Sequence, residues 1–209
     1  MMIVHDEHGW KDTNPTCANE YVLPVVCEIL QTIFHDNQVR ILDIGCGNGH
    51  VASRVAEFGY SVIGVDASRD GIEIAGSAYP DVQFKVCSVY DDRLVEIVGD
   101  PVDCVISLEV VEHLFLPRKL FDQSYRLLKT GGVLIVSTPY HGYFKNLALS
   151  LIGGWDRHFC AEWDGGHIKF FSKSTLARMA RNAGFSNPRF RGVGRFPGLW
   201  KSVIMVVQK

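Results

Sequence analysis

The chain has 209 residues, 47% of them hydrophobic, so one domain spanning residues 1–209 can bury a substantial core. Its formal net charge is −2, which argues against non-specific binding to nucleic acid or anionic lipid. No apolar run approaches the ~20 residues that span a bilayer, and residues 1–15 lack the pattern of a secretory signal. The cysteines show no zinc-binding spacing, so we expect reduced thiols in a cytoplasmic protein.

Helical and strand patterns alternate along most of the chain. Apolar residues recur at helical spacing over 22–34, inside an N-terminal helical segment of about residues 16–36. Short β-branched runs predict strands over 39–44, 61–66, 82–87, 102–108 and 132–139. The stretches between them predict helices over 49–59, 68–79, 91–98 and 117–129, the last ending at Gly131-Gly132. After a break at 140–172, we expect a helix over 173–185 and an antiparallel hairpin from runs near 189–196 and 201–208.

This order of elements indicates an α/β fold, with a doubly wound, Rossmann-like sheet that is mostly parallel and has helices on both faces. In such sheets ligands bind at the carboxyl ends of the strands. The aromatic-rich segment 140–172 follows the fifth predicted strand and contains no clear strand itself. We therefore expect it to form a lid or substrate insert over that edge of the sheet.

A glycine-rich turn follows the first predicted strand. The stretch "LDIGCGNG" ends the strand at Asp43 and places Gly45, Gly47 and Gly49 before the next helix. From Gly47 the letters fit the GxGxxA pattern of dinucleotide sites, but from Gly45 the third position is His50, and the pattern alone is weak. A carboxylate at Asp43 would repel a pyrophosphate in a partly dry site. It favours a cationic ligand such as S-adenosylmethionine, which carries a sulfonium and an ammonium and no phosphate.

A second acid ends the second predicted strand. Asp66, in "VIGVDAS", lies where a carboxylate can accept both hydroxyls of a ribose, a geometry that NAD sites also use. Asp66 thus indicates a nucleoside ligand, and Asp43 favours S-adenosylmethionine over NAD. For either acid alone, a role as a helix cap or turn residue is the structural alternative.

The motifs "LDIGCGNG", "VIGVDAS", "DCVISLEVVEHL" and "LLKTGGVLIVSTP" together resemble the class I S-adenosylmethionine-dependent methyltransferases over residues 39–139. The stretches "SLEVVEHL", "STP" and "GGHIKFFS" resemble the branch that contains the ubiquinone-biosynthesis O-methyltransferases. The resemblance implies a seven-stranded sheet whose last strand is antiparallel, as the two terminal runs allow. It also implies that S-adenosylmethionine is the methyl donor.

The same resemblance assigns the cofactor contacts. The turn passes close to the methionine part through Gly45, Cys46, Gly47 and Gly49, and Asp66 and Ala67 hold the ribose. Leu108 and Glu109 follow the fourth strand beside the cofactor. Many relatives have an Asp after the third strand that meets the adenine amino group. This chain has Ser88 and Val89 there, which leaves adenine recognition to Ser88 or to backbone groups.

The spacing of Glu109, Glu112 and His113 raises the question of a metal. On a helical turn, the i, i+3, i+4 pattern would gather two carboxylates and an imidazole, which suit Mg²⁺ or Mn²⁺. Some quinone-pathway O-methyltransferases and small-RNA 2′-O-methyltransferases carry metal on such a pattern, and many relatives carry none. Glu109 is also well placed to meet the cofactor's ammonium. We therefore expect no tightly bound metal, with a divalent cation as the alternative.

The segment 140–172 is expected to supply the acceptor contacts. Its histidines include two candidate general bases, His167 first and His141 second, with His158 a third histidine of the segment. Residues 143–155 have apolar positions at near-helical spacing, which fits an amphipathic lid or a peripheral contact with a membrane.

Three functions fit these observations. The first is O-methylation of a small, apolar acceptor by in-line displacement at the sulfonium, where alignment of donor and acceptor supplies much of the rate. The second is a nucleic-acid methyltransferase acting on RNA 2′-hydroxyls, which the balanced charge disfavours. The third is a cofactor-binding module without catalysis. We favour the first.

Overall fold

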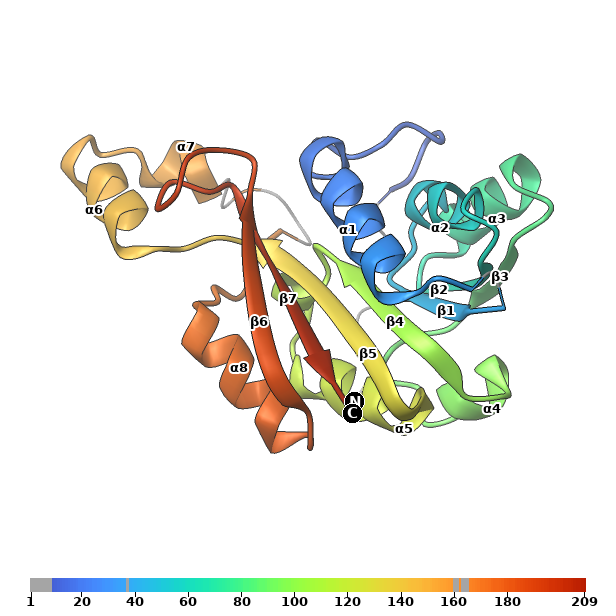
Figure 1. Cartoon of the computed structure of the whole chain (residues 1–209). Helices are drawn as coiled ribbons and strands as arrows, with labels where there is room; N and C mark the ends of the chain where they lie inside the picture. The colour runs from blue at the N-terminus through green and yellow to red at the C-terminus, as the bar shows by residue number, and fades with distance from the viewer. Residues whose placement is uncertain (1–8, 37, 160–161, 163–165) are drawn as a thin grey trace.

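The computed structural model describes residues 9–36, 38–159, 162 and 166–209. Among them, seven strands form one sheet in the order β3-β2-β1-β4-β5-β7-β6 (Figure 1). The strands are β1 (Arg40–Ile44), β2 (Ser61–Asp66), β3 (Gln83–Val86), β4 (Val102–Leu108), β5 (Leu128–Pro139), β6 (Ser186–Val193) and β7 (Ser202–Gln208). Neighbours from β3 to β5 pair in parallel, whereas β7 pairs antiparallel with both β5 and β6. The predicted mostly parallel sheet with an antiparallel last strand is confirmed.

Helices cover both faces of this sheet (Figure 1). One face carries α1 (Asn19–Ile33), α2 (His50–Ala56) and α3 (Arg69–Ala78), and the other carries α4 (Leu94–Val98), α5 (Arg118–Leu127) and α8 (Lys173–Asn182). The N-termini of two of these helices are capped by serine side chains. The Ser68 hydroxyl accepts the Gly71 N–H before α3, and Ser172 forms a capping box with Thr175 before α8.

The core lies in two layers, one on each side of the sheet. In β1, Leu42 and Ile44 pack in the layer with α4, α5 and α8, whereas Ile41 packs in the layer with α1 and α2. This follows from the two-residue period of a strand, whose successive side chains point to opposite faces. Because both faces of the central strands are buried, the carboxyl ends of β1, β2 and β4 are held rigidly at one edge.

The boundary between α5 and β5 differs from the prediction. The helix expected to reach residue 129 ends at Leu127, and β5 begins at Leu128. Gly131, expected to stop the helix, lies inside the strand with φ +80°, beside a register shift in the pairing of β4 with β5. Glycine adopts this left-handed backbone without a Cβ penalty. The Gly-Gly pair therefore marks a β-bulge and not a helix end.

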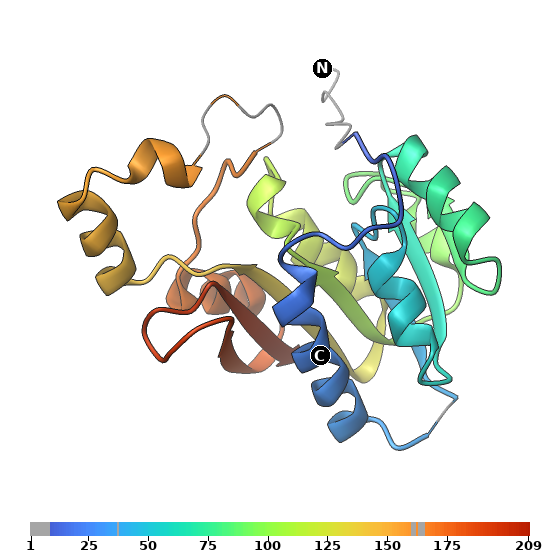
Figure 2. The same ribbon diagram turned by 90° about the horizontal axis from the view of Figure 1, so that it is seen from above.

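The segment after β5 contains two helices, α6 (Tyr143–Leu151) and α7 (Trp155–Phe159), and no strand among its described residues. Both helices project beyond the carboxyl end of β5, as the two views show (Figures 1 and 2). Residues 160, 161 and 163–165 of the predicted insert lie outside the described residues. None of the helices in the described part of the chain has the length and apolar character to cross a bilayer. The cytoplasmic location stays a prediction.

Candidate active site

A cavity of about 1080 Å³ lies at the carboxyl ends of the strands and extends beneath α6. Ten of the residues predicted from sequence line it: Gly45, Cys46, Asp66, Ala67, Ser88, Val89, Leu108, Glu109, His141 and His167. They come from the turn after β1, the ends of β2, β3 and β4, and the segment after β5. Residues far apart in the sequence therefore meet in one cavity.

The turn after β1 depends on glycine. Gly45, Gly47 and Gly49 have φ values of +82°, +52° and +80°, a backbone region that residues with a Cβ rarely adopt. A Cβ on Gly45 would lie 2.5 Å from Cγ2 of Val110, too close for any side chain. The turn can therefore approach the strand ends and a ligand only with glycine at these positions.

Asp66 ties this turn to the end of β2. Its Oδ2 accepts the Gly47 N–H at 2.8 Å, and its Oδ1 accepts the Ser68 N–H at 2.8 Å. Each carboxylate oxygen has further lone pairs, and the side chain lines the cavity. The geometry suits a carboxylate that accepts the two hydroxyls of a ribose while it holds the glycine turn in place.

Asp43 does not face the cavity. Its side chain is 2% exposed beneath the turn, and its Oδ2 has no hydrogen-bond partner among the described residues. Burial raises the pKa of Asp43 to about 8, and the nearby charge of Asp66 adds to this effect. The predicted contact of Asp43 with a cationic ligand is thus not what the geometry supports. The carboxylates that line the cavity are Asp66 and Glu109.

Gly47 and Gly49 also lie outside the cavity wall. A Cβ on Gly47 would lie 2.2 Å from Cζ2 of Trp10, and one on Gly49 would lie 2.7 Å from Cβ of Ala75. These two glycines therefore let Trp10 and α3 pack against the turn. Neither glycine lines the cavity, and their predicted contact with the cofactor stays a prediction.

The N-terminal segment over the turn was not predicted as part of the site. Asn48 is 3% exposed, and its Nδ2 donates to the carbonyl oxygens of Asp12 and Asn14, both at 2.9 Å. Trp10 lines the cavity and packs on the turn. The signal available in the sequence was Asn48 itself, a side chain with two donors inside the glycine-rich turn.

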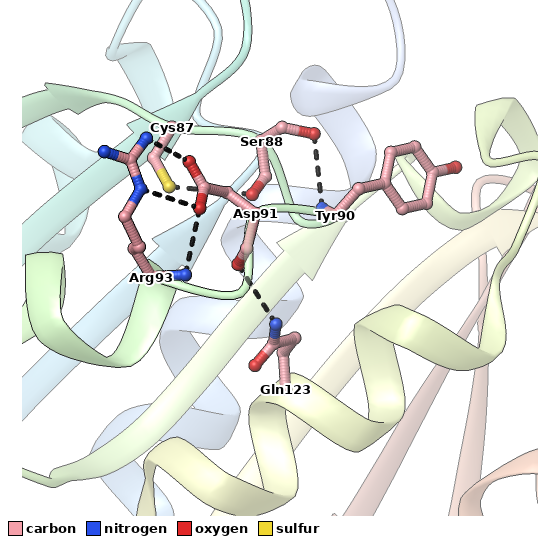
Figure 3. Close-up of polar contacts among 6 residues, drawn as sticks. All are labelled: Cys87, Ser88, Tyr90, Asp91, Arg93 and Gln123. Carbon is pink, nitrogen blue, oxygen red and sulfur yellow. Dashed lines mark hydrogen bonds and ion pairs between the residues drawn. The ribbon is translucent and has the colours of Figure 1, made fainter. Parts of the chain in front are cut away.

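The loop after β3 is a tight turn (Figure 3). The Ser88 hydroxyl accepts the Tyr90 N–H at 3.2 Å, and the Ser88 carbonyl accepts the Asp91 N–H at 3.0 Å. Asp91 pairs with Arg93 at 2.8 Å, and Gln123 of α5 donates to the Asp91 carbonyl at 3.2 Å. Ser88 lines the cavity, and no described residue accepts its hydroxyl proton. Ser88 thus both shapes the loop and keeps a donor for a ligand.

Glu109 lies apart from the helical turn on which its spacing placed it. It has φ +56°, and the 3₁₀ helix η1 (Val111–His113) begins only after it. Its carboxylate accepts the hydroxyls of Ser137 at 2.7 Å and Ser202 at 3.1 Å, which come from β5 and β7. Burial raises the pKa of Glu109 to about 7, although the two serine hydrogen bonds act to lower it. The spacing therefore does not bring Glu109, Glu112 and His113 together as three ligands.

A different trio does come together. One ligand atom each of Glu112, His113 and His167 lie within 4.8 Å of one another. The backbone N–H groups of Ile168 and Lys169 both donate to the Glu112 carbonyl at 3.1 Å, which folds the segment after α7 back over η1. Glu112 is 1% exposed, and neither carboxylate oxygen makes a well-formed hydrogen bond to a described residue. Burial raises the pKa of Glu112 well above its usual range, and the charge of Glu109 raises it further.

His141 lies in a cluster of rings and positive charges. Its ring centroid is 4.7 Å from that of Phe170 and 6.1 Å from that of His158. Burial is the main cause that lowers the pKa of His141 to about 4, and the charges of Lys145, His158 and His167 contribute to this shift. His141 is therefore neutral near pH 7 and a weak base.

The comparisons with known proteins agree with this geometry. A family model described as a methyltransferase domain matches residues 18–188. The chain belongs to this methyltransferase family. The membership confirms the sequence-based assignment to the S-adenosylmethionine-dependent methyltransferases.

Curated relatives of this methyltransferase are named ubiquinone biosynthesis O-methyltransferase. The protein from Ruegeria sp. (strain TM1040) is 29% identical over 170 residues, covering 78% of this chain and 66% of the relative. The protein from Maricaulis maris (strain MCS10) is 37% identical over 133 residues, covering 62% of this chain and 49% of the relative. The chain thus spans about half to just under two thirds of the length of these relatives.

Solved structures share the fold of this methyltransferase. Magnesium protoporphyrin IX methyltransferase from Synechocystis PCC 6803 with bound S-adenosylhomocysteine has a TM-score of 0.69 at 19% identity. The match covers 90% of this chain and 81% of that chain. An O-methyltransferase family protein from Burkholderia thailandensis has a TM-score of 0.64 at 17% identity, covering 90% of this chain and 58% of that chain.

Asp43 gives a prediction for pH dependence. In the folded protein without cofactor, the pKa of Asp43 is raised to about 8, so the carboxyl keeps its proton up to that pH. In the unfolded chain the same carboxyl loses its proton at its ordinary, lower pKa. Its contribution to stability is complete at low pH and is lost as the pH rises toward 8, by up to about 1.4 kcal/mol per pH unit. Asp43→Asn should therefore show a flatter pH profile than wild type between pH 5 and 8.

Urea unfolding of both proteins without cofactor, at pH 5, 6.5 and 8, measures the difference. Asp70→Asn, at an exposed acid on α3, is the control and should keep the wild-type profile. Parallel profiles for wild type and Asp43→Asn would contradict the burial argument.

Proposed function

We propose that the protein transfers the methyl group of S-adenosylmethionine to a hydroxyl oxygen of a small, apolar acceptor. The observation that carries this proposal is the single cavity that joins two kinds of wall. Carboxylates at the strand ends, Asp66 and Glu109, line it on one side, and apolar residues of α6 with several histidines line it on the other. The relatives named O-methyltransferases support transfer to oxygen.

In this proposal the strand ends hold the cofactor. Asp66 accepts the ribose hydroxyls, and the Ser88 hydroxyl with the Val89 backbone N–H meets the adenine. The Val89 N–H makes no hydrogen bond to a described residue, so it has a donor to offer at the cavity wall. Glu109, held by two serine hydroxyls, attracts the ammonium of the methionine part. Binding of a cation stabilises the ionised form of Glu109, whose pKa of about 7 leaves it easily deprotonated.

The acceptor oxygen then attacks the methyl group in line with the departing sulfur. The electrophile is already activated, so the protein acts mainly by alignment, which supplies up to ~7–11 kcal/mol. The acceptor hydroxyl also loses a proton, and His167 is the favoured base because it lines the cavity beside Glu112 and His113. His141 is the second candidate, weakened by its low pKa.

Glu112, His113 and His167 also fit a divalent cation, and with a cation bound His167 would be a ligand and not the base. The sequence-based expectation against a metal rested on Glu109, which would meet the cofactor's ammonium instead of a cation. The trio in the structure does not include Glu109 and has His167 in its place. One carboxylate with two imidazoles suits a first-row cation such as Mn²⁺ or Zn²⁺ better than Mg²⁺. A cation held there would act as a Lewis acid and lower the pKa of an acceptor hydroxyl.

The alternatives fit less well. An RNA substrate calls for basic, aromatic-interleaved surfaces, and the chain has a net charge of −2. A module that only binds the cofactor does not explain an apolar chamber that continues beyond the strand ends. Salt-dependent RNA affinity would favour the first alternative, and cofactor binding without transfer to any acceptor would favour the second.

Asp66→Ala should weaken the binding of S-adenosylhomocysteine at least about tenfold, because it removes charge-assisted hydrogen bonds to the ribose. Titration calorimetry measures this, with Asp70→Ala as the control at an exposed acid of the neighbouring helix. Wild type should bind S-adenosylhomocysteine and not NAD. Preferential binding of NAD over S-adenosylhomocysteine would contradict the proposal.

The metal site has its own test. After incubation with Mn²⁺ or Zn²⁺ and gel filtration, wild type should retain a stoichiometric cation, measured by elemental analysis. Glu112→Gln should lose it, because the ligand oxygen becomes a neutral amide, while Glu96→Gln, at an exposed helix position, should retain it. A wild-type protein that binds neither cation would restore the sequence-based expectation of no metal.

We also propose that the outer face of α6 contacts a membrane surface, as residues 143–155 indicate. Tyr143, Phe144, Leu147 and Leu151 are 75%, 69%, 43% and 78% exposed, and they lie along one side of the helix. The inner side of α6 lines the acceptor chamber. A lipid surface is therefore the occupant that would cover this face and deliver an apolar acceptor to the same helix.

Replacement of Phe144 and Leu151 by Asp should abolish most of the co-sedimentation with phosphatidylcholine vesicles. Phe58→Asp, at the end of α2, is the control. Equal sedimentation of wild type and the double variant would show that α6 does not contact lipid.

A further inference from the structure

Positive charges gather at the acceptor end of the cavity. Lys145 of α6 and Arg195 in the segment between β6 and β7 both line it. Lys145, in the first turn of α6, is followed along the cavity lining by Ala148 and Leu149 at positions i+3 and i+4, and by Ile152, which directly follows the helix and is 76% exposed. This part of the lining therefore presents a cation first and apolar side chains after it.

These two cations have no carboxylate partner among the described residues. The ion pairs found there join other residues, and neither Lys145 nor Arg195 takes part in one. Lys145 Nζ donates to the carbonyl of Tyr140 at 3.0 Å, which orients the ammonium without neutralising it. Glu109 is the acid whose charge acts on Lys145, and its oxygens already accept the hydroxyls of Ser137 and Ser202.

The surroundings make this arrangement costly without a ligand. Burial lowers the pKa of Lys145, the charge of Arg195 lowers it further, and Glu109 opposes the shift. The pKa of His158 is lowered by burial and by the charges of Lys145 and Arg195. The fold thus places two like charges on the lining of one cavity, Lys145 half-buried and Arg195 exposed, where an anion would relieve their repulsion. Arg195 is exposed, so the alternative to an anion-binding role is that water alone solvates its charge.

Resting on the proposed function, we infer that the methyl acceptor carries a carboxylate or phosphate bound between Lys145 and Arg195, with its apolar part along Leu149 and Ile152. Guanidinium and ammonium groups are the usual partners of both anions, and Arg binds either in a bidentate manner. From Lys145 to Ile152 the lining spans about 10 Å, at the helical rise of 1.5 Å per residue. An octyl chain is of comparable length.

Binding of matched octyl probes tests the inference without any methyl transfer. Octanoate, octanamide and octyl phosphate are titrated calorimetrically into protein saturated with S-adenosylhomocysteine. Octanoate and octanamide have the same chain and nearly the same size and differ in charge. Wild type should bind octanoate about tenfold more tightly than octanamide, the worth of a charge-assisted hydrogen bond. A preference between octanoate and octyl phosphate then identifies the anion.

Variants locate the subsite. Arg195→Gln should remove most of the preference for octanoate, and Arg195→Lys should restore part of it because the charge is kept. Arg189→Gln is the matched control, since it removes the same charge from an exposed position of β6 that does not line the cavity. Lys145→Gln should resemble Arg195→Gln.

Equal affinity of wild type for octanoate and octanamide, or no measurable binding of any probe, would overturn the inference. A preference for octanoate that survives in both Arg195→Gln and Lys145→Gln would overturn it as well. Titration of S-adenosylhomocysteine into the same variants separates the two proposals. Intact cofactor binding with no anion preference removes this inference alone, whereas lost cofactor binding in wild type removes the proposed function.

Discussion

The site depends on one pair of hydrogen bonds, from the backbone N–H groups of Gly47 and Ser68 to the carboxylate of Asp66. They join the turn after β1 to the end of β2, so that two neighbouring strands present one surface. The bonds are charge-assisted and lie at the edge of a sheet whose strands are buried on both faces, where each is strengthened by the low local dielectric. Asp66 also lines the cavity, so in the proposed function the group that shapes the turn would bind the ribose as well. Structure and binding would thus share one side chain.

The buried acids have different consequences. Asp43 and Glu112 lack full hydrogen bonding among the described residues, and burial raises the pKa of both. Asp43 lies beneath the turn, where a proton is the simplest way to remove its charge. Glu112 lies beside two imidazoles, where a cation can do so instead. The groups next to a buried carboxylate, more than its burial, decide whether a proton or a cation compensates its charge.

Much of the fold and half of the site were predictable from sequence because they depend on local pattern. Asp66, Ser88 and Leu108 lie at or just after the ends of strands that runs of hydrophobic residues identify in the sequence. The ends of parallel strands meet at one edge of the sheet, so these residues could be placed together. The burial of Asp43 beneath the turn could not be predicted, because the side chain just before a turn can point either into the core or into the cavity. Glu109 lines the cavity after the fourth strand, as predicted, but its hydrogen bonds to Ser137 and Ser202 were not predicted because β5 and β7 lie far along the chain. No spacing rule contains those contacts, nor the packing of Trp10 on the turn.

The sorting of charge along the cavity bears on the direction of the proposed reaction. Acids line the cofactor end through Asp66 and Glu109, and cations line the acceptor end through Lys145 and Arg195. S-adenosylmethionine enters with a positive sulfonium, which the acidic end attracts, and leaves as a neutral thioether, which it attracts less. An acceptor anion at the far end would be held away from the carboxylates by the two cations. In the proposed reaction the cavity would therefore orient both reactants by charge before contact, and loss of the sulfonium charge would weaken the hold on the product once the methyl group has moved.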